Sequence, residues 1–150
     1  MTCRIIRLFG DEILRKKSTP VDIVDDEIRQ TLNDMAETIH KTKNAAALAA
    51  PQIGILKQLI VIDLGKGPLK LVNPKIIRQE GQQEVVEGCL SIPDTWGKLI
   101  RPAKVTVRAL NENGKEITLK EKGSMAKCLC HEIDHLDGIL FTDLVTEYVE

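Results

Sequence analysis

The chain has 150 residues, of which 43% are hydrophobic and 29% are charged, and its formal net charge at pH 7 is −1. This size and composition are typical of a globular protein with one core, so we expect residues 1–150 to form a single domain. The near-neutral charge argues against a general affinity for DNA, RNA or anionic membranes, and no apolar run approaches the roughly 20 residues that would cross a bilayer.

The start of the chain and its cysteines both favour a cytoplasmic protein. Residues 1–7 are too short and too charged for a secretory signal. In such a compartment a cysteine is more often a core residue, a metal ligand or a nucleophile than half of a disulfide. The cysteines to be assigned are Cys3, Cys89, Cys128 and Cys130.

The first part of the chain predicts helices. A helical turn is expected over residues 11–17, ended by Pro20. The clearest amphipathic helix runs from residue 25 to about 43, because its apolar residues recur at steps of four, three and four. Those residues are Ile28, Leu32, Met35 and Ile39. An aspartate, Asp25 or Asp26, is available to cap its first turn.

The middle of the chain predicts strands and the end predicts one more helix. Strands are expected over residues 58–64, 69–72, 75–78, 84–86, 105–110 and 115–120. Asn113-Gly114 is a strong hairpin signal between the last two. The final helix covers residues 124–136, and Asp137-Gly138 ends it. We therefore predict an α+β fold with mainly antiparallel β-sheets around a buried C-terminal helix.

The strongest chemical signal lies in that final helix, at His131-Glu132-Ile133-Asp134-His135. Two histidines at positions i and i+4 of a helix lie about 6 Å apart on one face, so both imidazoles can reach one metal ion. Glu132 lies beside that face and can exchange protons with a water at the metal. The alternative is a chance pairing of two histidines on a helix surface.

A catalytic site of this type uses three protein ligands and leaves one position for water. His40 lies near the end of the amphipathic helix, where we expect it at the surface. Cys128 shares the histidines' helix but is too short to reach the metal easily, Cys130 points away, and Cys3 lies at the chain's start. Cys89, which follows a predicted strand and a glycine, is the better third ligand, although a buried core thiol is the alternative for it.

Three segments of the chain together resemble the peptide deformylase family, and they occur in the family's order. The third is His131-Glu132-Ile133-Asp134-His135-Leu136, the second is Glu87-Gly88-Cys89-Leu90-Ser91, and the first is Ala49-Ala50-Pro51-Gln52. The resemblance extends over nearly the whole chain, including residues 10–15 and the Arg101-Pro102 stretch.

The resemblance implies a bacterial cytoplasmic hydrolase that removes the formyl group from the N-terminal formyl-methionine of nascent polypeptides and releases formate. It implies one divalent metal, usually ferrous iron with zinc or nickel as substitutes, held by Cys89, His131 and His135. Glu132 would be the acid/base, and the backbone N–H of Leu90 and the side-chain amide of Gln52 would hold the developing oxyanion. Formyl-methionyl peptides, a transient ribosome contact and a monomeric state are the expected partners and assembly.

The chain departs from the family pattern mainly at Ala45 and Ala47, where the family has glycines. If those backbones need a positive φ, alanine is costly there; if they lie beside the substrate, each methyl narrows the cleft. Cys130 stands where the family usually has Gln, and Ser124 where it more often has an apolar residue. These changes bear on substrate fit more than on fold or metal binding.

Three other functions remain open at this point. One is a deformylase-like hydrolase of another N-acyl or formyl substrate, and another is a catalytically silent protein that keeps the fold as a binding module. A generic zinc endopeptidase of the His-Glu-x-x-His type would not explain residues 87–91 or 49–52. The intact set of Gln52, Leu90 and Glu132 with three ligands favours an enzyme over a silent module.

Overall fold

The computed structural model describes residues 3–150. Met1 and Thr2, the first two residues of the segment 1–7 that was expected not to be a secretory signal, lie outside the described residues. The two α-helices of the described part are α1 (Asp26–Lys41) and α2 (Gly123–Leu136). Its strands are β1 (Ala47–Ala49), β2 (Leu59–Ile62), β3 (Leu69–Glu80), β4 (Gln83–Cys89), β5 (Ile92–Arg101), β6 (Lys104–Leu110), β7 (Glu116–Lys122) and β8 (Glu147–Val149). Short 3-10 helices cover Glu12–Arg15, Ala50–Ile53 and Phe141–Asp143.

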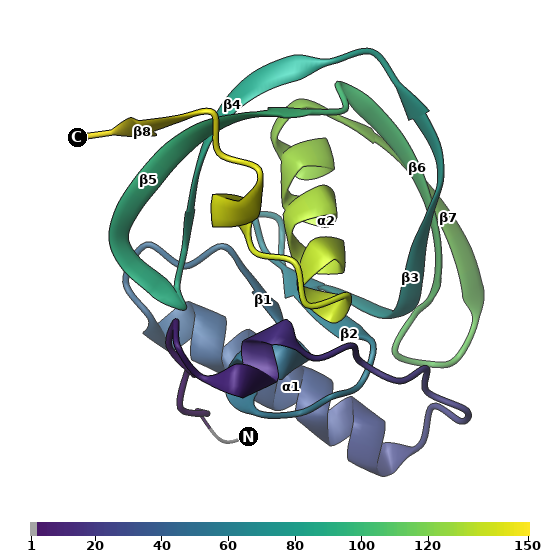
Figure 1. Ribbon diagram of the computed structural model, residues 1–150. Helices are drawn as coiled ribbons and strands as arrows, with labels where there is room; N and C mark the ends of the chain where they lie inside the picture. Colours follow the sequence, from purple (N-terminus) through teal and green to yellow (C-terminus); the bar gives the residue numbers. More distant parts are fainter. Residues whose placement is uncertain (1–2) are drawn as a thin grey trace.

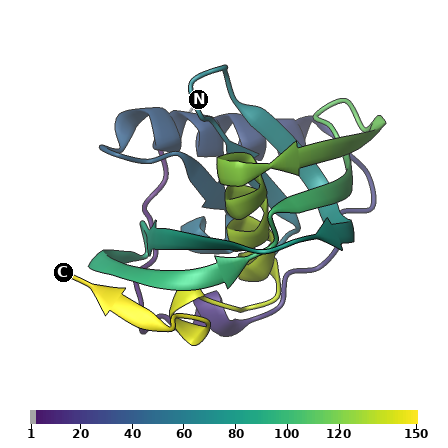
Figure 2. The same ribbon diagram turned by 90° about the horizontal axis from the view of Figure 1, so that it is seen from above.

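The strands form two antiparallel sheets with α2 between them (Figure 1). The larger sheet has the order β1-β2-β3-β6-β7, and the smaller sheet has the order β4-β5-β8. Seen from above in Figure 2, α1 lies at one side of the molecule and β5 and β8 at the other, with α2 in the middle. The predicted α+β class, with mainly antiparallel sheets around the C-terminal helix, is confirmed. Within residues 3–150, no helix is both long and apolar enough to cross a membrane.

Strand β2 shows how the sequence produces this layering. All four of its residues are buried, because successive side chains point to opposite faces of the sheet and both faces are covered. Leu59 and Val61 pack with α1, whereas Ile60 and Ile62 pack in the cluster that contains α2. Each side chain of this kind stabilises the fold by about 1.5–3 kcal/mol when fully buried.

Helix α1 confirms the predicted amphipathic helix, with its predicted apolar face in the core. The Asp25 side chain accepts a hydrogen bond from the Ile28 N–H and caps the first turn. The helix ends at Lys41, two residues earlier than expected. The helical turn expected over residues 11–17 is a shorter 3-10 helix, Glu12–Arg15.

Helix α2 also agrees with the prediction, and the residues that flank it fix where it begins and ends. It directly follows β7, and Gly138 ends it in the left-handed conformation, with φ of 74°. A Cβ at Gly138 would collide with the Arg15 backbone, so only glycine fits there. The apolar side of α2, with Ala126, Leu129 and Leu136, packs in the core cluster of the larger sheet.

Several strands differ from the prediction for physical reasons. The strands expected at residues 69–72 and 75–78 are one strand, β3, with a register shift between Val72 and Lys75. Asn73, between them, has a φ of 52°, and its side-chain amide bonds both the N–H and the carbonyl of Val21. β5 was not predicted, since its proline, aspartate and glycine are poor strand formers. β1 and β8 have three residues each, too few for a periodic pattern.

Candidate active site

The fold brings the three predicted ligands together from two elements. Cys89 is the last residue of β4, and His131 and His135 lie one turn apart on α2. One ligand atom from each of the three residues lies within 4.8 Å of the other two. The Cys89 Sγ is 3.3 Å from the His135 Nε2. This grouping of one thiol and two imidazoles is the donor set expected for a three-ligand catalytic metal.

The nitrogen of His135 that faces Cys89 is Nε2, and the protonation state of this imidazole decides whether the group fits a metal ion. Among residues 3–150, the His135 Nδ1 and the Glu132 Oε1 are buried without a hydrogen-bond partner. A buried polar atom left in this state costs free energy unless water or another group fills the gap. Burial, followed by the charge of His131, lowers the pKa of His135 well below its usual value. His135 is therefore the neutral imidazole that metal binding requires.

Glu132 and His131 each shift the pKa of the other in this buried site. Burial raises the pKa of Glu132 to about 7, so this carboxyl group can both accept and release a proton near neutral pH. Burial lowers the pKa of His131, but the charge of Glu132 and hydrogen bonds outweigh this effect and raise it to about 10. A metal ion that binds here displaces the His131 proton.

Among residues 3–150, the other candidates from the sequence are not part of this ligand group, although Cys128 borders the same cleft. Burial raises the pKa of Cys128 and of Cys130 to about 11, so both thiols stay protonated and are poor ligands at neutral pH. Cys3 is exposed. His40 is exposed at the end of α1, and its Nε2 lies 2.8 Å from the Asp63 carboxylate.

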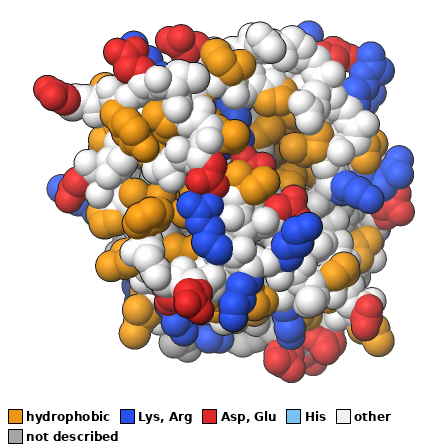
Figure 3. Space-filling model, viewed as in Figure 1, with side chains coloured by type: hydrophobic (Ala, Val, Ile, Leu, Met, Phe, Trp, Pro, Cys, Tyr) orange, Lys and Arg blue, Asp and Glu red, His pale blue; other side chains and the backbone are white. Residues whose placement is uncertain are grey.

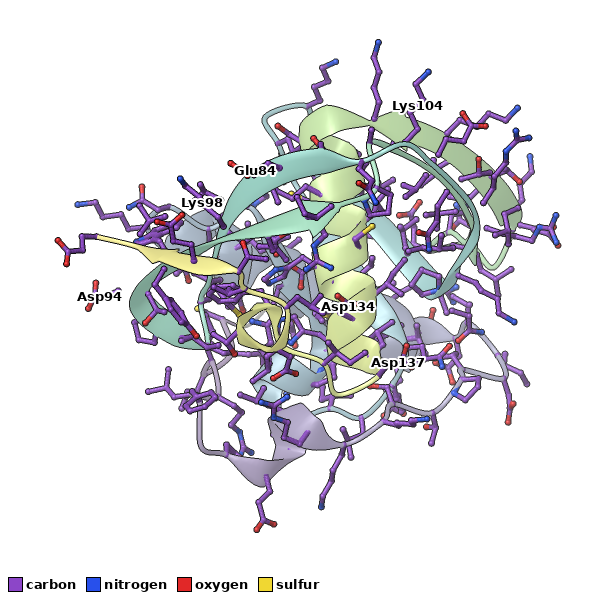
Figure 4. All side chains as sticks on the ribbon, turned by 45° about the horizontal axis from the view of Figure 1, so that its top comes forward. Glu84, Asp94, Lys98, Lys104, Asp134 and Asp137 are labelled. Carbon is purple, nitrogen blue, oxygen red and sulfur yellow. The ribbon has the colours of Figure 1, made fainter. Side chains whose placement is uncertain are left out.

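Glu87 and Arg101 contact the predicted metal ligand His131 directly or through each other, and neither was assigned a role from the sequence. The Glu87 Oε1 lies 2.6 Å from the His131 Nδ1. Arg101 donates two hydrogen bonds to Glu87, at 2.7 and 2.9 Å, and one to Asp134 at 2.6 Å. The side chains of Arg101 and Glu87 are buried, with only 5% and 2% of their surface exposed. Asp134 lies on α2, where Figure 4 labels it.

This chain of charges fixes the orientation of His131. Burial raises the pKa of Glu87, but the hydrogen bonds from Arg101 and His131 outweigh burial and lower the pKa to about 2. The ionised Glu87 accepts the Nδ1–H of His131, which leaves the Nε2 free to bind a metal. Glu87 lies two residues before Cys89, but no spacing rule links it to a histidine 44 residues away.

Gln52 is held so that its amide N–H points toward the ligand group. Its Oε1 accepts a hydrogen bond from the Ala49 N–H at 2.9 Å, and its Nε2 donates to the Ser91 Oγ at 3.1 Å. The same Nε2 lies 3.5 Å from the Cys89 Sγ. Both Gln52 and Ser91 are buried, at 1% and 0% exposure. Ser91, a residue given no role from the sequence, therefore positions a predicted catalytic group.

A cleft of about 370 Å³ opens over these residues. Its walls come from residues 43–47, from the end of β4 through Leu90, from the start of β5, and from α2. Gln52, Cys89, His131 and Glu132 all border it. Trp96 of β5 forms part of the wall, and a Cβ at Gly88 would lie 2.5 Å from its ring, so a side chain at position 88 would displace this ring.

Ala45 and Ala47 line the cleft. Of the two effects expected of them, a backbone cost and a narrowing of the cleft, only the narrowing remains. Neither alanine has a positive φ, so the expected backbone cost is wrong. The left-handed residue in this segment is Asn44, with φ of 63°, and asparagine tolerates that conformation. The methyl groups can therefore act only by taking up space in the cleft.

Comparison with known proteins gives one consistent result. A family model described as "Polypeptide deformylase" matches residues 3–149. "Peptide deformylase 2" of Clostridium acetobutylicum is 69% identical over 150 residues, which cover 100% of both chains. "Peptide deformylase" of Acetivibrio thermocellus is 54% identical, covering 100% of this chain and 88% of that one. The crystal structure of a peptide deformylase from Thermotoga maritima has a TM-score of 0.94 and 34% identity, covering 97% of this chain and 99% of that one.

Proposed function

Since the chain belongs to the polypeptide deformylase family, we propose that Cys89, His131 and His135 hold the divalent metal ion of a deformylase active site. The protein is an enzyme that removes the formyl group from the N-terminus of nascent polypeptides. The observation that supports the ligand assignment is the approach of the three ligand atoms to within 4.8 Å of one another.

The metal that we propose is ferrous iron, with zinc or nickel as substitutes. A thiolate with two imidazoles is a donor set that suits all three metals. When bound, the ion lowers the pKa of a water molecule and so supplies a nucleophile at neutral pH. We also propose that the protein is a monomeric, single-domain enzyme of the bacterial cytoplasm. It would meet formyl-methionyl chains at the ribosome.

Glu132 is proposed to move the proton that the reaction requires. In the hydrolysis, water adds to the formyl carbon, the carbon–nitrogen bond breaks, and the products are formate and a free amine. The amine nitrogen gains a proton that originates from the attacking water. Glu132 borders the cleft, and its buried Oε1 has no hydrogen-bond partner among residues 3–150, so this carboxyl group can take the proton and return it to the leaving amine.

Gln52 and Leu90 are proposed to stabilise the negative charge that develops on the formyl oxygen. The Gln52 amide is already fixed by Ala49 and Ser91, so it loses little freedom when the substrate reacts. Leu90 follows Cys89 on the cleft wall, where its backbone N–H is the second donor. Removing one such fixed donor typically costs about 3 kcal/mol of transition-state stabilisation.

The function is tested by the release of formate from formyl-Met-Ala-Ser by ferrous protein kept free of oxygen. We expect turnover, and we expect little with acetyl-Met-Ala-Ser as a matched substrate. Faster hydrolysis of the acetyl peptide would favour the second candidate, a hydrolase of another N-acyl substrate. That candidate is supported only by the methyl groups of Ala45 and Ala47 in the cleft.

Replacing Cys89 by Ala is expected to abolish stoichiometric metal binding. The variant keeps two imidazoles but loses the thiolate, the one ligand that comes from the smaller sheet. Metal content per chain, measured on the purified protein, gives the result without any activity assay. Cys128→Ala is the matched control and should bind metal normally. Full occupancy in the Cys89 variant would show that the ligand assignment is wrong.

The double reversion Ala45→Gly with Ala47→Gly is expected to raise kcat/KM on formyl-Met peptides. Two methyl groups on the cleft wall restrict how closely a peptide can approach. A misplacement of about 1 Å can cost on the order of a hundredfold in rate, so the gain can be large. An unchanged or lower kcat/KM would mean that the alanines belong to this enzyme's own working cleft. Ala103→Gly, outside the cleft, is the control.

A further inference from the structure

Residues 4–9 lie behind the active site and contact both of its halves. We call them the N-terminal segment. One end is attached to α1, where the Arg4 N–H donates to the Thr38 Oγ1 at 2.8 Å and the Arg4 guanidinium pairs with the buried Asp34 at 2.9 Å. In Figure 1 the segment is drawn in purple, and it runs from α1 toward the turn between β4 and β5.

Two backbone hydrogen bonds attach the N-terminal segment to the active site. The Arg7 N–H donates to the Gln52 carbonyl at 2.6 Å, and the Phe9 N–H donates to the Ser91 carbonyl at 2.7 Å. Gln52 lies in the 3-10 helix that follows β1 of the larger sheet. Ser91 lies in the turn between β4 and β5 of the smaller sheet. The segment therefore joins one residue from each half of the site.

The two residues that accept these bonds also bond each other. The Gln52 Nε2 donates to the Ser91 Oγ at 3.1 Å. Ser91 directly follows Leu90, whose backbone N–H is the other proposed oxyanion donor. The distance between the two donors thus depends on how the 3-10 helix is held against the turn of the smaller sheet. Two hydrogen bonds from alternate residues of one short segment fix that distance.

Packing of the core explains only part of this attachment. Ile6 packs against the core cluster that contains the apolar face of α1, but the side chains of Ile5, Leu8 and Phe9 are 84%, 54% and 58% exposed. Figure 3, seen from the same side as Figure 1, shows hydrophobic side chains at the surface in this part of the molecule. A segment that only covered the core would bury more of these side chains. Its contacts with the active site are made by its backbone.

We propose that the N-terminal segment is a positioning element for catalysis, and that its two backbone bonds hold the oxyanion donors Gln52 and Leu90 in place. This inference rests on the proposed function, which assigns those donors. Residues 3–11 contribute nothing to the cleft lining, so the segment acts through the residues that it holds and not by contact with the substrate. Fixed donors stabilise the transition state more than the bound substrate, so loosening them lowers kcat and leaves KM nearly unchanged.

The test removes one N–H at a time, since proline has no backbone donor. Arg7→Pro removes the bond to Gln52, and Arg7→Ala is the matched control that loses the same side chain but keeps the N–H. Leu8→Pro controls for backbone restriction, because among residues 3–150 the Leu8 N–H donates to no other backbone group. We expect Arg7→Pro to lower kcat on formyl-Met-Ala-Ser at least about tenfold, with KM and metal content per chain unchanged. Both controls should turn over like the unchanged protein.

A second background separates positioning from a general structural role. In Gln52→Ala the side-chain donor is absent, so Arg7→Pro has nothing left to position and should lower kcat less than about twofold there. A general structural role would lower kcat by the same factor in both backgrounds. Phe9→Pro, with Phe9→Ala as its control, tests the second bond and should also lower kcat with KM unchanged.

Equal loss of kcat in both backgrounds, equal loss in Arg7→Ala, or a raised KM with unchanged kcat would overturn the inference. Where one proline variant loses its metal, the other decides; loss of metal from both would overturn the inference, because the segment would then hold the fold together. Failure of the proposed function is a separate result, in which the unchanged protein releases no formate or Gln52→Ala keeps its full kcat. The segment would then have no donor to position, and the inference would fail with it.

Discussion

Glu132→Gln is expected to bind metal normally and to lose turnover by about two to four orders of magnitude. Glutamine has nearly the same size but cannot accept and return a proton, and general acid–base catalysis contributes about 10²–10⁴-fold. Glu132 is 4% exposed and its pKa is raised to about 7 by burial, so it is poised for this transfer. The measurement is kcat on formyl-Met-Ala-Ser together with metal content per chain.

The matched control is Asp137→Asn, which makes the same chemical change at an exposed carboxylate just after the end of α2 (labelled in Figure 4). It should leave both kcat and metal content unchanged. If Glu132→Gln retains near-normal turnover with metal bound, the proton is carried by another group. If the variant instead loses its metal, Glu132 contributes to the ligand set, and the assignment of three protein ligands is incomplete.

Periodic patterns and spaced motifs explain which features could be predicted from the sequence. Ile28, Leu32, Met35 and Ile39 define α1 because a helix repeats every 3.6 residues and its buried face must be apolar. His131 and His135 predict a site because their spacing on a helix places both rings on one face. Both signals are local, so neither depends on how distant segments pack.

The features that could not be predicted depend on contacts between distant segments. β5 is stabilised by its pairing with β4 and β8 more than by strand-forming residues. β3 continues through Asn73 because Val21, 52 residues away, bonds its side chain. In the active site, Glu87 and Arg101 lie in segments that the sequence highlighted, but their roles arise only when β4, β5 and α2 meet. No spacing within one element encodes such a partnership.

Arg101→Met is expected to destabilise the protein by about 3–5 kcal/mol. Methionine fills a similar volume but removes the guanidinium, which leaves Asp134 without its cation and leaves the Glu87 carboxylate, 2% exposed, with the His131 imidazole in place of two partners. Breaking a buried ion pair by removing one partner is costly because a buried charge is left uncompensated. The free energy of unfolding in urea, measured on metal-free protein, isolates this effect from the stabilisation that metal binding adds.

Metal affinity gives a second, independent readout of the same substitution. Glu87 orients His131 through the hydrogen bond to Nδ1, and Arg101 holds Glu87 through two hydrogen bonds. Disturbing the partner of a metal-binding histidine typically weakens metal binding by about 10–100-fold. Arg108→Met is the matched control, because its ion pair with Glu116 is exposed and should contribute no more than about 1 kcal/mol. A loss at Arg101 no larger than the loss at Arg108, with unchanged metal affinity, would mean that the buried network neither stabilises the fold nor positions His131.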